Sequence, residues 1–212
     1  MHCFLVAISF VFICLTEGIL GEHTENNVRI PGSMVYLRHK WELWFGSLDI
    51  NNDGIISVAD ADECTQRFTE IQTHRGERRQ RVVEYAIKKW WTKCILSSEE
   101  RTESMIQYVN RRQSEYLKSK STFTKKMQTC FEDIFDIVDV NDDDLVDLQE
   151  YIDLYKAFKH DDEELMIDNF ERVSPGAKPV PLINMVAFWV QFSSSSEPHQ
   201  KDFVKEEFED GV

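Results

Sequence analysis

Residues 49–60, DINNDGIISVAD, carry oxygen-bearing side chains at regularly spaced positions. A hard cation such as Ca²⁺ takes oxygen ligands from positions 1, 3, 5, 7, 9 and 12 of such a loop, with a sharp bend at position 6. Gly54 stands at the bend, where a positive φ is needed and glycine adopts it freely. The alternative is an Asx-rich turn without an ion. The predicted ligands are Asp49, Asn51, Asp53, the carbonyl of Ile55, Ser57 (through a water molecule) and Asp60.

Residues 139–150, DVNDDDLVDLQE, repeat the pattern. Position 6 is Asp144, and a left-handed conformation costs a non-glycine residue about 1–2 kcal/mol, less for Asp and Asn. Six acidic residues in this loop repel one another unless a cation is present, although a surface acidic turn is the alternative. The predicted ligands are Asp139, Asn141, Asp143, the carbonyl of Leu145, Asp147 and Glu150.

The two loops differ at position 12, where Asp60 is one methylene shorter than Glu150. Glutamate binds Ca²⁺ through both oxygens at this position, whereas Mg²⁺ wants only six ligands at shorter distances. We therefore expect the first site to discriminate less well against Mg²⁺ than the second.

Each loop is flanked by segments with apolar residues at a spacing of three and four, the period of an amphipathic helix. The sequence thus predicts two helix–loop–helix units. The first is bounded by Leu37, Trp41, Trp44, Phe45 and Leu48 before its loop and by Ala61, Cys64, Thr65 and Phe68 after it. The second is bounded by Met127, Phe131, Ile134, Phe135 and Val138 and then by Tyr151, Leu154, Tyr155 and Phe158.

Two further helical pairs surround stretches without spaced carboxylates, residues 96–103 and 174–181, which we call the silent loops. A single unit leaves an apolar face open, so we expect an all-α fold of four units in two pairs, residues 34–118 and 119–192. Ile56 and Val146 can form short β-bridges to the silent loops, expected at Thr102 and Val180.

Composition excludes several functions. The chain has 212 residues, 42% of them hydrophobic, and a net charge of −14, which argues against nucleic-acid binding. The histidines form no spacing motif, and no nucleophile elbow or phosphate loop is present, so we expect no enzyme. The basic residues 74–81 are expected to form a solvated linker and helix start, the alternative being an anionic partner.

The N-terminus is typical of a cleaved secretory signal peptide, residues 1–21, with an apolar run over residues 3–15. That run is short for a membrane span, although a signal anchor is the alternative. We therefore expect a secreted or luminal protein without a transmembrane segment when mature. Residues 22–33 should form a flexible arm, and residues 193–212 a Ser-rich and acidic tail, either disordered or loosely docked.

Three cysteines remain after the signal peptide, namely Cys64, Cys94 and Cys130. Their spacing fits no zinc site. Buried free thiols are the simpler expectation, and a secreted chain also permits one disulfide, whose partners the spacing does not identify.

Taken together, these motifs resemble the EF-hand superfamily, and in particular the invertebrate sarcoplasmic calcium-binding proteins, with calexcitin and the coelenterate photoproteins as relatives. The resemblance covers roughly residues 34–192. It rests on Trp41, Phe45 and Leu48-Asp49, Asp60 in place of Glu, Arg67-Phe68-Thr69-Glu70-Ile71, Trp90-Trp91, and Met185, Trp189 and Phe192.

The resemblance implies a compact four-hand protein that binds Ca²⁺ and Mg²⁺ as a buffer. The chain departs from the family in its signal peptide and in keeping only two live loops, so a structural role for the ions is equally open. Two alternatives are a calcium sensor with a protein partner, which the sequence does not identify, and a binding protein for an apolar, luciferin-like molecule. The latter's cavity could be lined by Trp41, Trp44, Trp90, Trp91 and Trp189, which are otherwise core residues.

Overall fold

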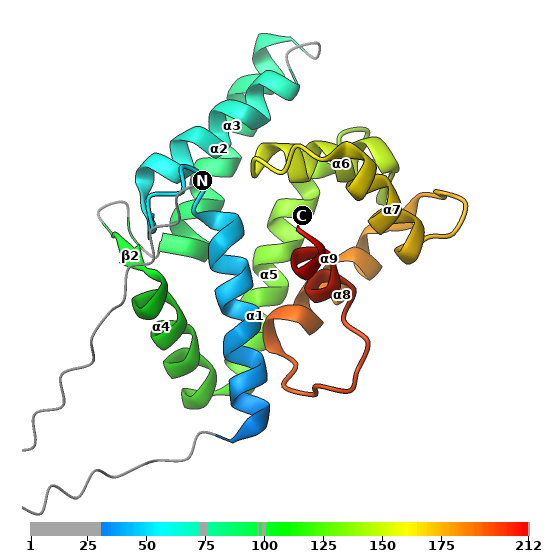
Figure 1. The fold of residues 1–212 in the computed structure, drawn as a ribbon. Coiled ribbons are helices and arrows are strands. Elements are labelled where there is room, and N and C mark those ends of the chain that lie inside the picture. Colours follow the sequence, from blue (N-terminus) through cyan, green and yellow to red (C-terminus); the bar gives the residue numbers. More distant parts are fainter. Residues whose placement is uncertain (1–30, 73–75, 97, 99–100, 212) are drawn as a thin grey trace, which may run out of the picture.

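The fold was analysed in a computed structural model, which describes residues 31–72, 76–96, 98 and 101–211. Within these residues most of the chain is helical, which confirms the all-α expectation, and each strand is two residues long (Figure 1). No helix in the described part is long and apolar enough to cross a membrane. The elements of the first half are α1 (Gly32–Leu48), β1 (Ile55–Ile56), α2 (Val58–Ile71), α3 (Glu77–Trp90), the π-helix η2 (Trp91–Leu96), β2 (Glu103–Ser104) and α4 (Met105–Lys118).

The second half follows after a single residue, Ser119, which ends α4 and caps the next helix by accepting a hydrogen bond from the Thr122 N–H. The halves are not separate bodies, because α2 packs on α6, α3 on α5 and α1 on α8. The elements of the second half are α5 (Lys120–Val138), β3 (Leu145–Val146), α6 (Leu148–Ala157), α7 (Glu163–Val173), β4 (Val180–Pro181), α8 (Leu182–Ser194) and α9 (Phe203–Asp210).

The first helix starts earlier than expected. Residues 32–33, assigned to a flexible arm from the sequence, belong to α1, because the Pro31 carbonyl accepts hydrogen bonds from the N–H groups of Met34 (2.8 Å) and Val35 (3.1 Å). The rest of that arm and the expected signal peptide, residues 1–30, lie outside the described residues.

The two strand pairs bring each of the two predicted ion-binding loops, residues 49–60 and 139–150 (the live loops), against a silent loop. β1 and β2 are antiparallel, with Ile55 opposite Ser104 and Ile56 opposite Glu103. The expected bridge from Ile56 to Thr102 was therefore wrong by one residue. Ser104 and Gln107 form the capping box that starts α4, and the paired strand β2 lies directly beside this helix start. β3 and β4 pair Val146 with Val180 as expected.

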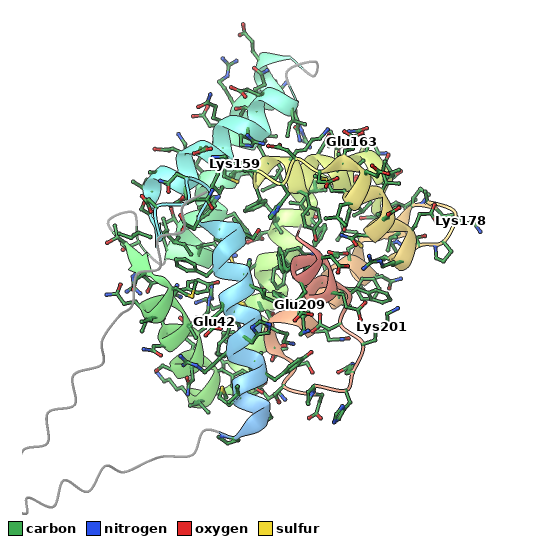
Figure 2. All side chains as sticks on the ribbon, in the orientation of Figure 1. Glu42, Lys159, Glu163, Lys178, Lys201 and Glu209 are labelled. Atoms are coloured by element: carbon green, nitrogen blue, oxygen red, sulfur yellow. A yellow bond between two sulfur atoms is a disulfide. The ribbon has the colours of Figure 1, made fainter. Side chains whose placement is uncertain are left out.

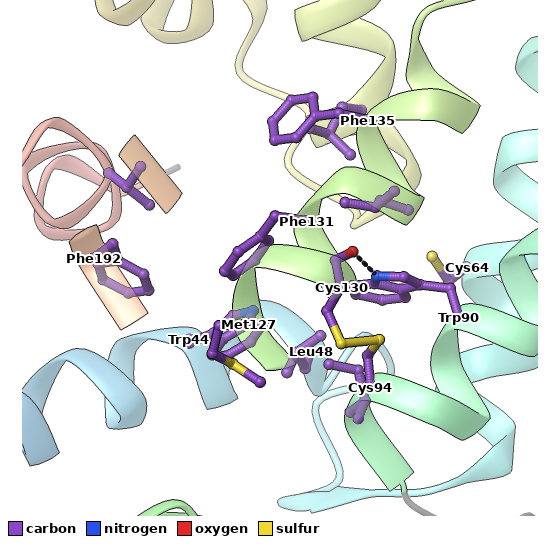
Figure 3. Packing of buried hydrophobic residues seen from close by; sticks show 14 of the residues in the cluster. Trp44, Leu48, Cys64, Trp90, Cys94, Met127, Cys130, Phe131, Phe135 and Phe192 are labelled. Atoms are coloured by element: carbon purple, nitrogen blue, oxygen red, sulfur yellow. Dashed lines mark hydrogen bonds between the residues drawn. A yellow bond between two sulfur atoms is a disulfide. The ribbon is translucent and has the colours of Figure 1, made fainter. Parts of the chain in front are cut away.

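One apolar core runs through both halves. Figure 3 shows Trp44 and Leu48 of α1, Phe131 and Phe135 of α5 and Phe192 of α8 gathered around it. The charged side chains labelled in Figure 2, among them Glu42, Glu163 and Lys178, lie on the outside of this cluster. The spacing of apolar residues therefore identified the buried faces of the helices correctly.

A disulfide between Cys94 and Cys130 crosses this core and joins η2 to α5 (Figure 3). Beside it, the Trp90 indole N–H donates to the Cys130 carbonyl at 2.7 Å. Cys64 is a buried free thiol, and burial raises its pKa to about 12. The sequence left the pairing open, and the structure resolves it.

The C-terminal segment is neither disordered nor loosely docked. α8 continues to Ser194, two residues beyond its expected end, and residues 203–210 form a further helix, α9. Val204 and Phe208 lie four residues apart on one face of α9 and are buried. Asp202 caps this helix by accepting a hydrogen bond from the Lys205 N–H.

Candidate metal-binding loops

The first loop (residues 49–60) connects α1 to α2, and the second loop (residues 139–150) connects α5 to α6. Position 1 of each loop, Asp49 or Asp139, is the C-cap residue of the preceding helix. Position 9, Ser57 or Asp147, is the N-cap of the following helix. Two helices anchored in the core therefore fix both ends of each loop.

Backbone N–H groups of the first loop bind its own ligand oxygens. Asp49 accepts hydrogen bonds from Asp53 N–H (3.1 Å) and Gly54 N–H (2.8 Å). Asn51 Oδ1 accepts from Asp53 N–H and Asp53 Oδ1 from Ile55 N–H, both at 2.9 Å. Because these donors lie two to five residues further along, the loop backbone curves around the side chains at positions 1, 3 and 5.

The second loop has the same network at equivalent positions. Asp139 accepts from Asp143 N–H (3.2 Å) and Asp144 N–H (2.9 Å). Asn141 Oδ1 accepts from Asp143 N–H and Asp143 Oδ1 from Leu145 N–H, both at 3.0 Å. The two loops thus differ in sequence but adopt the same local structure, which indicates that they share one function.

Two residues of each loop are left-handed. At position 6, Gly54 has φ 83° and Asp144 has φ 59°, so Asp144 adopts the conformation that the sequence required of it. At position 4, Asn52 and Asp142 also have positive φ, 58° and 57°. Sequence reasoning missed position 4, although the Asn and Asp found there are the non-glycine residues that tolerate this region best.

The residues at position 12 reach different backbone groups. Asp60 accepts from the N–H of position 9 at 2.8 Å and from the N–H of position 3 at 3.3 Å. Glu150 accepts from the N–H of position 9 at 3.0 Å and from that of position 2 at 2.8 Å. The longer side chain therefore spans further across its loop and makes the shorter second bond.

Both position-12 carboxylates are buried, Asp60 being 0% and Glu150 6% exposed. Burial raises the pKa of each, and neighbouring loop carboxylates raise it further, against the opposing effect of the two backbone hydrogen bonds. Asp136, one turn before the second loop, also has a raised pKa because of burial and its neighbours Asp133 and Asp139. A cation in either loop would relieve this repulsion.

The donor set fits a hard divalent cation, because every predicted ligand atom is oxygen and five of the six positions carry a side-chain oxygen. In the described residues no three His, Cys, Asp or Glu side chains are gathered around one point. The loop carboxylates instead bind backbone N–H groups. The side chains that would bind an ion are therefore present on a formed loop backbone, and because a carboxylate has several lone pairs, it can bind an ion while it accepts these hydrogen bonds.

In the silent loop that pairs with the first loop, arginine side chains neutralise the buried carboxylate of Glu103. Arg111 binds Glu103 through Nε (2.8 and 3.0 Å) and a terminal nitrogen (2.6 Å), and Arg101 adds a contact of 3.1 Å. This bidentate pair leaves Glu103 no free oxygen for a metal. In the other pair, the N–H of Leu182 donates to the Asp144 carbonyl at 2.9 Å, so the first residue of α8 braces the bend of the second loop.

An apolar cavity of about 30 Å³ lies between the two halves, lined by Trp44, Trp90, Phe131, Tyr155 and Trp189 among others. Trp41 and Trp91, also suggested from the sequence as lining residues, are buried in the core but do not line this cavity. A cavity of this volume holds one or two water molecules, whereas pockets for drug-sized ligands measure about 300–1,000 Å³.

Comparisons with known sequences and with solved structures both identify relatives of this chain. The chain is 33% identical over 175 residues to a sarcoplasmic calcium-binding protein of Mizuhopecten yessoensis, which covers 82% of this chain and 98% of that protein. No protein-family model matches.

Among solved structures, the coelenterazine-binding protein of Renilla muelleri, in its calcium-loaded apo form, matches with a TM-score of 0.68, at 16% identity over 84% of this chain and 97% of that chain. An amphioxus sarcoplasmic calcium-binding protein matches with a TM-score of 0.54, at 17% identity over 82% of this chain and 96% of that chain. At these identities the solved structures support the fold alone.

Proposed function

The chain belongs to the family of sarcoplasmic calcium-binding proteins, and on that premise we propose that it binds two calcium ions, one in each live loop. The observation that carries this proposal is the matching hydrogen-bond network of residues 49–60 and 139–150, which places the same oxygen types at the same positions. Magnesium is the competing ion, chiefly at the first loop.

In each site, the carboxylates at positions 1 and 12 supply negative charge from buried positions at the ends of two helices. Positions 3 and 5 supply exposed oxygens, and position 7 a carbonyl. The ion neutralises carboxylates that otherwise repel one another. Binding therefore favours the folded loop over the unfolded chain, and a bound ion stabilises the protein.

Isothermal titration calorimetry of the chain without its N-terminal 21 residues tests this proposal. The expected stoichiometry is two Ca²⁺ per chain. Asp49→Asn and Asp139→Asn should each remove one site, whereas the control Asp62→Asn, an exposed change in α2 outside the ligand positions, should retain both. A stoichiometry of zero would end the proposal.

The role that fits best is an ion buffer or an ion-stabilised structural protein without catalysis. The continuous core across both halves supports it, because a sensor must open an apolar groove on binding. The small cavity offers no support for an apolar ligand of luciferin size.

We further propose that the protein enters the secretory pathway. The apolar run over residues 3–15 supports this location. The disulfide between Cys94 and Cys130 supports it independently, because such bonds persist in oxidising compartments.

Expression of the full chain in animal cells, followed by N-terminal sequencing of the protein in medium and cell fractions, tests the location. The expected product begins after Gly18 or Gly21 and is found in the medium or in a luminal fraction. An uncleaved chain in the cytosol, with Cys94 reduced, would contradict the proposal.

A further inference from the structure

Helix α9 lies across the second half of the molecule, against α1, α7 and α8 (Figure 1). Its apolar side chains enter an aromatic cluster in which Phe208 contacts the rings of Phe192 (5.4 Å between centroids) and Trp189 (5.8 Å). A segment of eight residues thus closes part of the core of the second half.

The start of α9 is held by a compensated charge. Asp202 accepts a bond of 2.9 Å from the Lys40 ammonium, and both side chains are buried. Lys40 also donates to the Ser195 carbonyl at 2.7 Å and the Gln191 carbonyl at 3.3 Å. Every proton of this ammonium has an acceptor, so the buried charge at Asp202 is balanced.

The middle of α9 carries a buried carboxyl group with no cation to balance it. Glu207 is 4% exposed and accepts a hydrogen bond from the Tyr155 hydroxyl of α6. No ion pair within the described residues includes Glu207. An ionised carboxylate here would be a buried charge that neutral donors alone support, which is unfavourable.

The other charged groups around α9 have partners of their own. From α7, Arg172 pairs with Asp210, and from α1, His39 binds Glu209 at 3.2 Å. Within α9, Lys205 also pairs with Glu209. α8 presents aromatic rings rather than titratable groups, so no element packed on α9 offers Glu207 a free cation.

Two more titratable groups lie near Glu207. Tyr151 of α6 faces it, and burial raises the pKa of Tyr151 well above the usual value, so this hydroxyl stays neutral at physiological pH. His160 packs against Phe208 (6.3 Å between ring centroids), and burial lowers its pKa to about 4. Neither group changes charge between pH 5 and 8, which leaves Glu207 as the buried group of this cluster that titrates there.

We propose that α9 is a proton-controlled latch, docked firmly when Glu207 is protonated and loosened when Glu207 ionises. Burial raises the pKa of Glu207 from 4.5 to about 7 in the docked helix. The proton is bound more tightly in the docked state than in the free one, so the docking contributed by Glu207 is full below about pH 4.5, falls as pH rises to about 7, and changes little beyond.

The latch lies beside the second loop, because Tyr151 directly follows Glu150, and Tyr155 is one turn further along α6. Release of α9 would uncover apolar side chains of α8, including Phe192, which is 0% exposed in the docked state. The device would therefore couple pH to the exposure of an apolar face on the half of the molecule that carries this loop.

Hydrogen exchange of the α9 amides in the ion-free chain, expressed as protection relative to an unstructured peptide at the same pH, tests the latch. From pH 5.5 to pH 7.5 the protection of residues 204–210 should fall by roughly twentyfold, the ratio that pKa values of 4.5 and about 7 give. Amides of α5 serve as the internal reference for global unfolding.

Glu207→Gln keeps the shape and cannot ionise, so its α9 protection should not change over this range. Glu206→Gln, a change to the neighbouring carboxyl that faces partly to solvent, should keep the wild-type fall. If Glu207→Gln does not fold, titration of the Glu207 carboxyl carbon by NMR in the wild type replaces it, with an expected midpoint near 7. A midpoint near 4.5, or protection in Glu207→Gln that falls as in the wild type, would overturn the proposal.

Discussion

At the scale of single residues, the bend at position 6 allows the energetic cost of a left-handed backbone to be measured separately from any effect of side-chain packing. A methyl group at Gly54 would meet no atom within 4 Å, yet φ there is 83°. Gly54→Ala should therefore destabilise the ion-free protein by about 1–2 kcal/mol through the backbone alone. Gly46 in α1 has equally open surroundings and an ordinary helical φ. Gly46→Ala should stabilise by about 0.5–1 kcal/mol, and urea denaturation measures both. Equal effects of the two substitutions would refute the strain argument.

Position 12 makes the two sites chemically distinct. Asp60 makes its second backbone hydrogen bond to position 3 at 3.3 Å, whereas the longer side chain of Glu150 makes its second bond to position 2 at 2.8 Å. Asp60→Glu should widen the preference of the first site for Ca²⁺ over Mg²⁺ by roughly tenfold, or about 1.4 kcal/mol. Glu150→Asp is the reciprocal control and should narrow the preference of the second site. Calorimetric titration with each ion checks both, and unchanged ratios would exclude position 12 as the determinant.

Residue types in the sequence identified the loop positions because a cation site needs oxygens at fixed intervals along one short segment. The same reasoning could not find the ion pair of Glu103 with Arg111, which neutralises a silent loop. Those residues lie eight apart across a strand and a helix start, and nothing in their spacing distinguishes them from surface charges. Ligand positions within one short loop can therefore be predicted from sequence, whereas an ion pair between residues of different elements cannot.

At the scale of elements, the disulfide holds η2 against α5. It closes a separation of 36 residues, for which the chain-entropy argument gives about 3–4 kcal/mol of stabilisation. The double variant Cys94→Ala and Cys130→Ala should lose about that much in urea denaturation. Cys64→Ala, which removes a buried thiol and leaves the bridge intact, should lose only about 1 kcal/mol. Equal losses would mean that the bridge contributes packing alone.

Apolar periodicity predicted the helices with their inward faces, and it failed where tertiary contacts set the geometry. After Trp90, α3 widens into the π-helix η2, whose carbonyls accept hydrogen bonds from arginine side chains of α4: Arg112 at Cys94 and Arg111 at Ile95, both 2.8 Å. The pairing of Cys94 with Cys130 depends on this turn, so spacing alone could not identify it. For α9, the Asp202 cap and the Val204–Phe208 spacing were the signals that sequence reasoning overlooked.

At the scale of the whole molecule, the two halves are joined by more than the disulfide. Arg67 of α2 donates to the Lys156 carbonyl of α6 at 2.7 Å and binds Asp161 at the same distance. Lys159 reaches back to the carbonyl of Ile50 in the first loop at 3.1 Å. Because these contacts and the core cross the boundary at Ser119, neither half can open independently of the other. This arrangement favours a rigid ion-binding protein over a sensor with two separate lobes.

The final prediction follows from that continuity. Thermal unfolding should be a single transition with and without Ca²⁺, because one core and one set of cross-half contacts hold both loops. Calcium at about one hundred times the dissociation constant should stabilise the protein by about 2.7 kcal/mol per site, and the midpoint of thermal unfolding should rise accordingly.

Binding of a hydrophobic dye at constant pH should not increase on adding Ca²⁺, since a buffer exposes no new groove. Two resolved transitions, or a calcium-dependent increase in dye fluorescence, would favour the sensor instead. Glu207→Gln, measured alongside at pH 7.5, keeps α9 docked and so separates calcium-driven exposure from release of the latch.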